Sequence, residues 1–192
     1  MGWLIAGLVL FLGIHSVRMA APSLRDNLIE TRGEGAWKGS YSFIALAGLV
    51  LLVWGYGQAR VSDASIFFYG APVWAVHLVA LLMWIALMLL IASQLPPGRI
   101  KAAVKHPMIL SVKVWAVAHL LVNGDLASYL LFGSFLVWAI INRIAVKRRG
   151  DPDFQTVAIR NDIIAIIGGS ALFVLLFVWA HLYLFGASPW PV

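Results

Sequence analysis

Apolar runs long enough to cross a lipid bilayer recur along this chain, and they constrain its fold more than any other feature. A membrane-spanning helix needs about 20 predominantly apolar residues, and six stretches fit that description. The sequence therefore predicts an all-α fold, a polytopic membrane helix bundle with about six transmembrane helices. The predicted spans are residues 2–21, 41–59, 72–95, 107–122, 127–146 and 163–185.

The composition agrees with this interpretation. Hydrophobic residues make up 62% of the chain and charged residues only 11%, whereas soluble domains carry roughly a quarter charged residues. A length of 192 residues suits one transmembrane domain, which we expect to occupy residues 1–192. The chain has no cysteine, which excludes disulfides, iron–sulfur clusters, covalent haem attachment and thiol catalysis.

Two of the predicted spans have alternative interpretations. The fourth is short and carries Lys113, so a re-entrant or strongly tilted segment is the alternative there. The first could be mistaken for a signal peptide, in which positive charge precedes the apolar core. Here Arg18, Arg25 and Arg32 follow the core, and we expect an uncleaved first span.

The basic residues predict the orientation of the bundle. The links after the first, third and fifth spans are rich in lysine and arginine, whereas the links after the second and fourth hold only Arg60. Basic links of membrane proteins face the cytoplasm, so both termini are predicted on the outer (periplasmic) side. The net charge of +6 then reports orientation against a lipid bilayer, and no nucleic-acid partner is expected.

Five histidines stand out in so apolar a chain. His15, His77, His119 and His181 fall inside apolar stretches, and His106 lies at the start of one. An ionisable side chain within a membrane is costly and by default indicates a functional site. Imidazole is also a common ligand of metal ions and of haem iron.

Helix geometry places three of the histidines at one depth. At ~1.5 Å of rise per residue, His77, His119 and His181 each lie about one turn from the outer end of their span. Trp115 and Asn123 share the face of His119, so all five are candidate cofactor-binding residues, with His77 or His181 as partner of His119. His106 lies about 140° around the helix from His119 and ~20 Å along it, so the two cannot share one metal ion.

Other interpretations of these histidines stay open. Each could hydrogen-bond to a neighbouring helix in a haem-free scaffold. Catalytic zinc usually adds a carboxylate or a third histidine, and no predicted span contains Asp or Glu. Haem b with two axial histidines needs only two imidazoles and an apolar slot between helices. Elsewhere, residues 123–125 (Asn-Gly-Asp) predict a tight turn, and Gly168 and Gly169 predict close helix packing.

Several motifs resemble the NnrU family over essentially the whole chain. The most specific is a run with His106-Pro107, Trp115, Ala118-His119-Leu120 and Asn123-Gly124. Residues 13–16 (Gly-Ile-His-Ser), 35–38 (Gly-Ala-Trp-Lys), 131–135 (Leu-Phe-Gly-Ser-Phe) and 147–149 (Lys-Arg-Arg) fit the same family. The resemblance implies a multi-pass protein of the bacterial inner (cytoplasmic) membrane, associated with nitrite and nitric oxide respiration.

The NnrU family is in turn similar to the plastid 15-cis-zeta-carotene isomerase, a multi-pass enzyme with haem b. Its axial histidines match His15 and His119 of this chain. It also carries a cysteine, implicated in a redox-dependent ligand switch, where this chain has Ala116. Such a switch cannot operate here. His15 and His119 also differ in predicted depth by roughly 12–15 Å, whereas His77 lies at the level of His119.

These observations lead to three functional hypotheses. We expect a membrane protein that binds haem b, with His119 and His15 as metal ligands, and that supports nitrite and nitric oxide respiration through redox, sensing or assembly of denitrification enzymes. The enzymatic alternative is a haem-dependent cis–trans isomerase of a polyene lipid such as zeta-carotene. The third hypothesis is a haem-free membrane scaffold or assembly factor.

Overall fold

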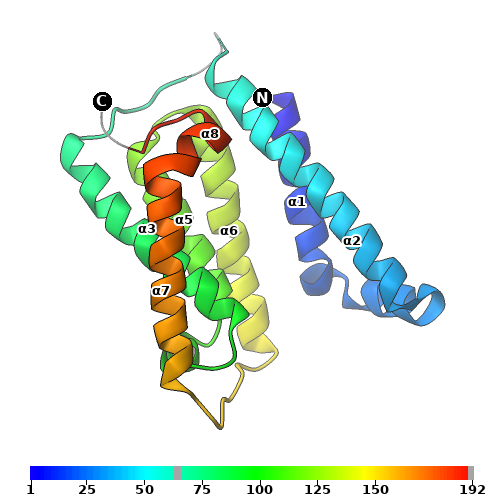
Figure 1. Cartoon of the computed structure of the whole chain (residues 1–192). Helices are drawn as coiled ribbons and strands as arrows, with labels where there is room; N and C mark the ends of the chain where they lie inside the picture. Colours follow the sequence, from blue (N-terminus) through cyan, green and yellow to red (C-terminus); the bar gives the residue numbers. More distant parts are fainter. Residues whose placement is uncertain (63–65, 190–192) are drawn as a thin grey trace. The chain divides into compact units, whose positions relative to one another are not determined.

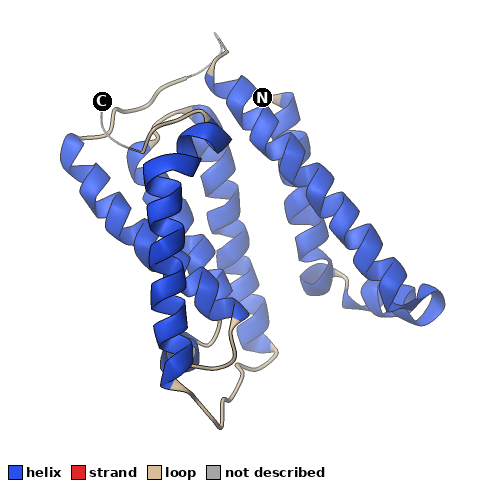
Figure 2. Ribbon diagram, in the orientation of Figure 1, coloured by secondary structure: helices blue, strands red, loops and turns tan. Residues whose placement is uncertain are grey.

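The chain is helical along its whole length. The structure, a computed structural model, describes residues 1–62 and 66–189, and no strand occurs among them (Figure 2). In chain order the elements are α1 (Gly2–Ala20), α2 (Pro22–Arg60), α3 (Val73–Gln94), α4 (Arg99–Val104), α5 (Pro107–Val122), α6 (Leu126–Arg148), α7 (Ile159–Leu175), a π-helical turn η1 (Leu176–Ala180) and α8 (His181–Phe185) (Figure 1).

Five helices are long and apolar enough to cross a membrane: α1, α2, α3, α6 and the continuous run from α7 to α8. Their large apolar side chains are widely exposed, for example Val9 at 67%, Phe43 at 74% and Ile167 at 64%. Such side chains suit contact with lipid. The chain is therefore a multi-pass helical membrane protein. The 16-residue helix α5 has the predicted bounds but is shorter than a usual span, so its crossing and the orientation of the termini stay predictions.

Helix α2 begins much earlier than the predicted second span. It starts at Pro22, with Pro in the first turn, and includes the polar stretch that the hydropathy pattern leaves outside the membrane. Its helical geometry is interrupted at Gly33, where φ is 81° and ψ is 157°. Glycine adopts a positive φ without steric cost, so Gly33 divides α2 into a polar first part and an apolar second part.

Two compact units make up the chain, and each is described by itself. Unit 1 comprises Met1–Ile66 and Asp125–Ser134, and unit 2 comprises Phe67–Gly124 and Phe135–Val192. The division concerns packing, and the single transmembrane domain over residues 1–192 stays a prediction.

Helices α1 and α2 of unit 1 pack through glycine. A Cβ atom added at Gly7 would lie 2.6 Å from the Leu52 backbone N, and one at Gly48 would lie 2.7 Å from the Phe11 N. A Cβ at Gly55 would lie 2.5 Å from the Leu4 N. Helices approach this closely in membranes where small residues line the interface. The pairing of early α1 residues with late α2 residues makes the two helices antiparallel.

A second part of unit 1 joins the end of α2 to the start of α6 by polar contacts. The Asp125 side chain is 1% exposed, and its carboxylate accepts hydrogen bonds from the Ser128 backbone N (2.9 Å) and Oγ (2.7 Å). The Arg60 Nε lies 3.6 Å from the same carboxylate, and the Tyr56 hydroxyl is 2.8 Å from the Ser128 Oγ. Asp125 therefore caps α6 as an N-cap residue does, which explains the predicted turn.

In unit 2, helix α3 packs against both α5 and α7. A Cβ atom added at Gly169 of α7 would lie 2.6 Å from the Met88 Cα, which confirms the predicted close packing at this glycine. Side-chain hydrogen bonds supplement the contact. The Trp84 Nε1 donates to the Ser170 Oγ over 2.8 Å, and the Ser111 hydroxyl donates to the Ala86 carbonyl over 2.7 Å.

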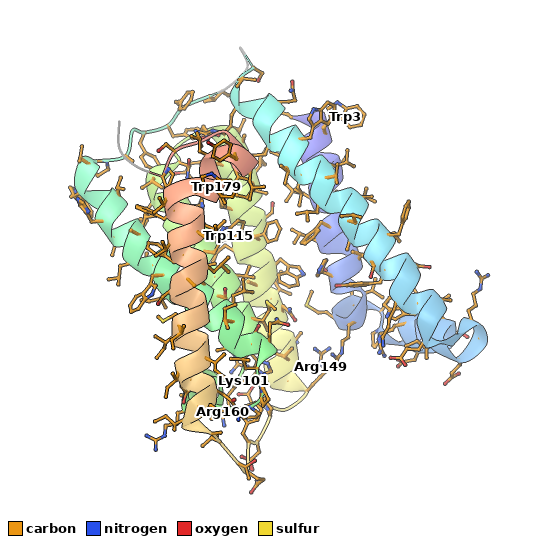
Figure 3. All side chains as sticks on the ribbon, in the orientation of Figure 1. Trp3, Lys101, Trp115, Arg149, Arg160 and Trp179 are labelled. Carbon is orange, nitrogen blue, oxygen red and sulfur yellow. The ribbon has the colours of Figure 1, made fainter. Side chains whose placement is uncertain are left out.

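One end of unit 2 is basic. Figure 3 shows Lys101, Arg149 and Arg160 at that end and Trp179 toward the other. The basic end is held by the Asp162 carboxylate, which accepts hydrogen bonds from the backbone N–H groups that begin α4, over 2.9 and 3.0 Å. The Lys101 ammonium donates to two carbonyls at the end of α3. Unit 2 thus has the one-ended charge distribution that the sequence predicts.

Candidate functional site

Two histidines from different helices of unit 2 lie next to each other. His119 comes from the last turn of α5, and His181 is the first residue of α8. Their ring centroids are 6.5 Å apart, and the ring planes differ by 19°. Two imidazoles bound at about 2 Å to opposite sides of one metal ion would have centroids roughly 6 Å apart. The spacing of the pair is therefore that of two axial ligands.

Hydrogen bonds fix the same tautomer on both rings. The His119 Nδ1 lies 2.9 Å from the Trp115 carbonyl, and the His181 Nδ1 lies 2.7 Å from the Ala187 carbonyl. A carbonyl only accepts, so each Nδ1 carries the proton, and each Nε2 keeps a lone pair. This arrangement is usual for histidines that bind metal through Nε2.

The end of α5 is held so that His119 has a defined position. The Asn123 backbone N and Nδ2 both donate to the His119 carbonyl, over 3.0 and 2.9 Å. The Tyr69 hydroxyl donates to the next carbonyl, that of Leu120. These bonds satisfy carbonyls that a helix end otherwise leaves unpaired. The structure thus gives Asn123 a capping role, and its predicted contact with a cofactor stays a prediction.

Irregular backbone places His181. The five residues of η1 directly before it form a π-helical turn, a feature frequent at functional sites. After α8 the chain reverses at Gly186, which has a φ of 66° and ends the helix in the left-handed conformation that glycine favours. The reversal brings the Ala187 carbonyl to the His181 ring. No hydropathy or spacing signal in the sequence indicates the π-helical turn.

Aromatic side chains surround the pair. The Trp115 ring centroid lies 5.3 Å from that of His119 and, on its other side, 5.3 Å from that of Phe135 in an edge-on contact. The Phe185 ring lies 5.0 Å from that of His181. The helical spacing of Trp115 and His119 correctly indicates that the two share a face. These rings give the pair the apolar surroundings that a large planar cofactor needs.

The other histidines of unit 2 lie elsewhere. His77 is exposed near the start of α3, and its ring makes no contact with His119 within the described part of the chain. His106 begins α5, and its Nε2 lies 3.1 Å from the Asp151 carboxylate. Arg143 donates two hydrogen bonds to that carboxylate, over 2.7 and 3.0 Å. They lower the pKa of Asp151 from 3.8 to about 2.

His15 belongs to unit 1, where its ring lies among aromatic side chains. Its Nδ1 donates to the Phe11 carbonyl over 2.6 Å, so it has the same tautomer as His119 and His181. The ring stacks on Phe11 at 4.2 Å and lies 5.3 Å from the Tyr41 ring. Because His15 and His119 belong to different units, the ligand pair implied by the resemblance stays a prediction.

Metal sites with larger ligand sets are not found. Among residues 1–62 and 66–189, no group of three or more His, Cys, Asp or Glu side chains could hold a metal ion. A four-coordinate zinc site uses at least three protein ligands. The pair of histidines therefore suits a group that supplies its own equatorial ligands, as haem does.

Comparison with known families gives one finding. The family model described as NnrU protein matches residues 3–189, nearly the whole chain. No curated protein and no solved structure matches. The chain belongs to the NnrU family.

Proposed function

We propose that this NnrU family membrane protein binds haem b in unit 2 and supports nitrite and nitric oxide respiration in a bacterial inner membrane. His119 is the proposed first axial ligand and His181 the second. His15, which the resemblance implies as the second ligand, is the alternative to His181. When bound, haem b would supply one-electron redox chemistry and a site for nitric oxide.

The observation that carries the proposal is the geometry of His119 and His181. Their ring centroids are 6.5 Å apart, and both Nδ1 atoms donate to backbone carbonyls. Two unrelated hydrogen bonds thus leave two Nε2 lone pairs at ligand spacing. Trp115 and Phe185 provide flat apolar surfaces beside the two rings. The residues present therefore fit a bis-histidine haem.

An absorption spectrum of the detergent-purified protein, oxidised and then reduced with dithionite, tests the proposal. We expect a Soret band with sharp reduced α and β bands in the wild type. The bands should be lost or strongly shifted in His119→Ala and in His181→Ala. They should be unchanged in the control variant His77→Ala, because that ring is exposed and lies outside the pair. Far-ultraviolet circular dichroism of each variant would verify that the helices persist.

Different outcomes distinguish the alternatives. A spectrum unchanged in His181→Ala but lost in His15→Ala would replace the second ligand. The absence of a Soret band even after haem is supplied would overturn haem binding and favour the haem-free scaffold. Conversion of a cis polyene such as zeta-carotene by the reduced protein would favour the isomerase instead. Ala116, which replaces the cysteine of the plastid enzyme, is fully buried.

Growth tests the proposed role in respiration. A strain that lacks this protein, supplied with either the wild type or His119→Ala, should differ in anaerobic growth on nitrite. Growth on oxygen should be the same for both. Equal anaerobic growth would separate this protein from nitrogen-oxide respiration.

A further inference from the structure

Unit 1 contains a cavity of about 350 Å³ between α1 and the two parts of α2. The cavity lies toward the end of α1, beyond the tight glycine contacts, and α2 turns back around it at Gly33. Its wall includes two aromatic side chains, three cationic side chains and one imidazole: Trp37, Tyr41, Arg18, Arg25, Lys38 and His15.

The change from glycine to aromatic residues along α2 explains why a cavity forms there. Gly48 lets the α2 backbone approach that of Phe11 in α1. Nearer the start of α2, Tyr41 faces His15 instead, with ring centroids 5.3 Å apart. Trp37, one turn earlier, lies 6.0 Å from Tyr41. Bulky rings hold the helices farther apart than glycine does, and space remains beside them.

The charge lining the cavity is positive. Arg18, Arg25 and Lys38 line it, and none of its described lining residues is acidic. Two carboxylates lie close by, because Asp26 is 2.8 Å from Arg25 and Glu34 is 3.0 Å from Lys38. Both pairs are solvent-exposed, and exposed ion pairs contribute little free energy. An anion that enters the cavity can therefore compete for these cations.

The residue types specify the anion. Guanidinium groups donate paired hydrogen bonds that match phosphate oxygens, and lysine adds a point charge. Trp and Tyr are enriched where a membrane meets water. Their position beside the cations, where two apolar helices meet a polar segment, indicates a ligand with a charged head and an apolar tail. The predicted orientation places this end in the cytoplasmic leaflet, which attracts basic segments to anionic lipids.

We propose that this cavity binds the phosphate headgroup of an anionic phospholipid from the cytoplasmic leaflet. Arg18, Arg25 and Lys38 hold the phosphate, and Trp37 and Tyr41 contact the glycerol and the first part of the acyl chains. The inference is independent of the proposed haem site, since the cavity and the pair of His119 and His181 belong to different units.

Native mass spectrometry of the full-length protein tests the inference. The protein in detergent is mixed with equal amounts of phosphatidylglycerol and phosphatidylcholine, and the retained lipid is identified. We expect the wild type to prefer phosphatidylglycerol. The double variant Arg18→Gln with Lys38→Gln should lose roughly tenfold or more of that preference, since each removed cation near a membrane surface weakens the attraction to anionic lipid.

A charge-matched variant provides the control. Lys147→Gln with Arg148→Gln removes two cations from the exposed end of α6, outside the cavity, and should keep the wild-type preference. Arg18→Lys with Lys38→Arg preserves the charge and should keep most of it, which guards against misfolding of the glutamine variant. Equal losses in both glutamine variants would overturn the site, because the preference would then depend on net charge alone.

Inorganic phosphate distinguishes the source of the anion. At concentrations matched to the lipid, it should not displace phosphatidylglycerol, since it lacks the apolar tail. Displacement would overturn the lipid assignment in favour of a soluble phosphate. The measurement is repeated in His119→Ala, where the lipid preference should persist whether or not haem is bound.

Discussion

The two units hold their helices together in different ways. Unit 1 depends on backbone contact, with glycines of α1 and α2 at positions where a single added carbon would clash. Unit 2 has one such contact, at Gly169, and adds hydrogen bonds between side chains or from side chain to backbone. The contrast shows that close approach leaves room for a ligand only where the glycines end, whereas hydrogen bonding can place two histidines at a chosen spacing.

The glycine contact of unit 1 should give the largest effect on stability. Gly55→Ala would place a Cβ 2.5 Å from the Leu4 backbone N, and neither backbone can yield without separating the helices. We expect a loss of about 1–3 kcal/mol or more, as for overpacked cores. The thermal unfolding midpoint in detergent would measure it. Gly57→Ala, with open space around its Cβ position, is the matched control, and equal midpoints would contradict glycine packing.

The polar contacts of unit 1 should come next. Asp125→Ala removes the N-cap of α6 and leaves Arg60 without its carboxylate partner. Loss of a helix N-cap costs about 0.5–2 kcal/mol. Chemical unfolding of the variant, compared with that of the exposed control Asp153→Ala, would measure the difference. An effect as large as that of Gly55→Ala would remove the distinction between backbone packing and side-chain contacts within unit 1.

A hydrogen bond between helices of unit 2 should contribute less. Trp84→Phe keeps an aromatic ring but removes the donor to Ser170. Such bonds within membrane proteins average about 0.6 kcal/mol. The unfolding midpoint of Trp84→Phe should therefore fall slightly, while that of Trp74→Phe, at an exposed position, should not. A loss above 2 kcal/mol would show that unit 2 depends on its polar contacts more strongly than the contrast implies.

The smallest effect concerns pH and the exposed end of unit 2. Arg143 holds the pKa of Asp151 at about 2, below its ordinary 3.8. A carboxyl with a lowered pKa stabilises the fold fully above the ordinary value, and the contribution disappears as pH falls toward 2. The unfolding midpoints of wild type and Asp151→Asn should differ at pH 7 and converge between pH 4 and 2. A difference that persists at pH 2 would argue against this ion pair.

The sequence predicts the apolar helices well because hydropathy registers them directly. Helix α5 has the predicted bounds, since Pro107 favours a helix start and Asn123-Gly124 a turn. The early start of α2 could not be predicted in this way. Its first part is helical but polar, so hydropathy places it outside the membrane, and the sign of φ at Gly33 depends on how the chain reverses.

The candidate site shows the same limit. Counting residues from the span ends correctly indicates that His119 and His181 lie at similar depth. It cannot tell which neighbour faces His119, because that depends on the rotation of each helix about its axis. The cavity of unit 1 was missed for a related reason. Arg18 and Trp37 lie far apart along the chain, and only the antiparallel pairing of α1 and α2 brings them to one cavity.

The π-helical turn before His181 has a consequence for the evolution of this site. A π-helical turn holds one more residue than an α-helical turn does, so it amounts to a single-residue insertion. Deleting one of its five residues would restore regular helix and rotate everything after it by about 100°. His181 would then point to a different neighbour, with every side chain before the turn unmoved. Lineages with and without this extra residue would thus differ in which helix meets His119, through a change in length and not in composition.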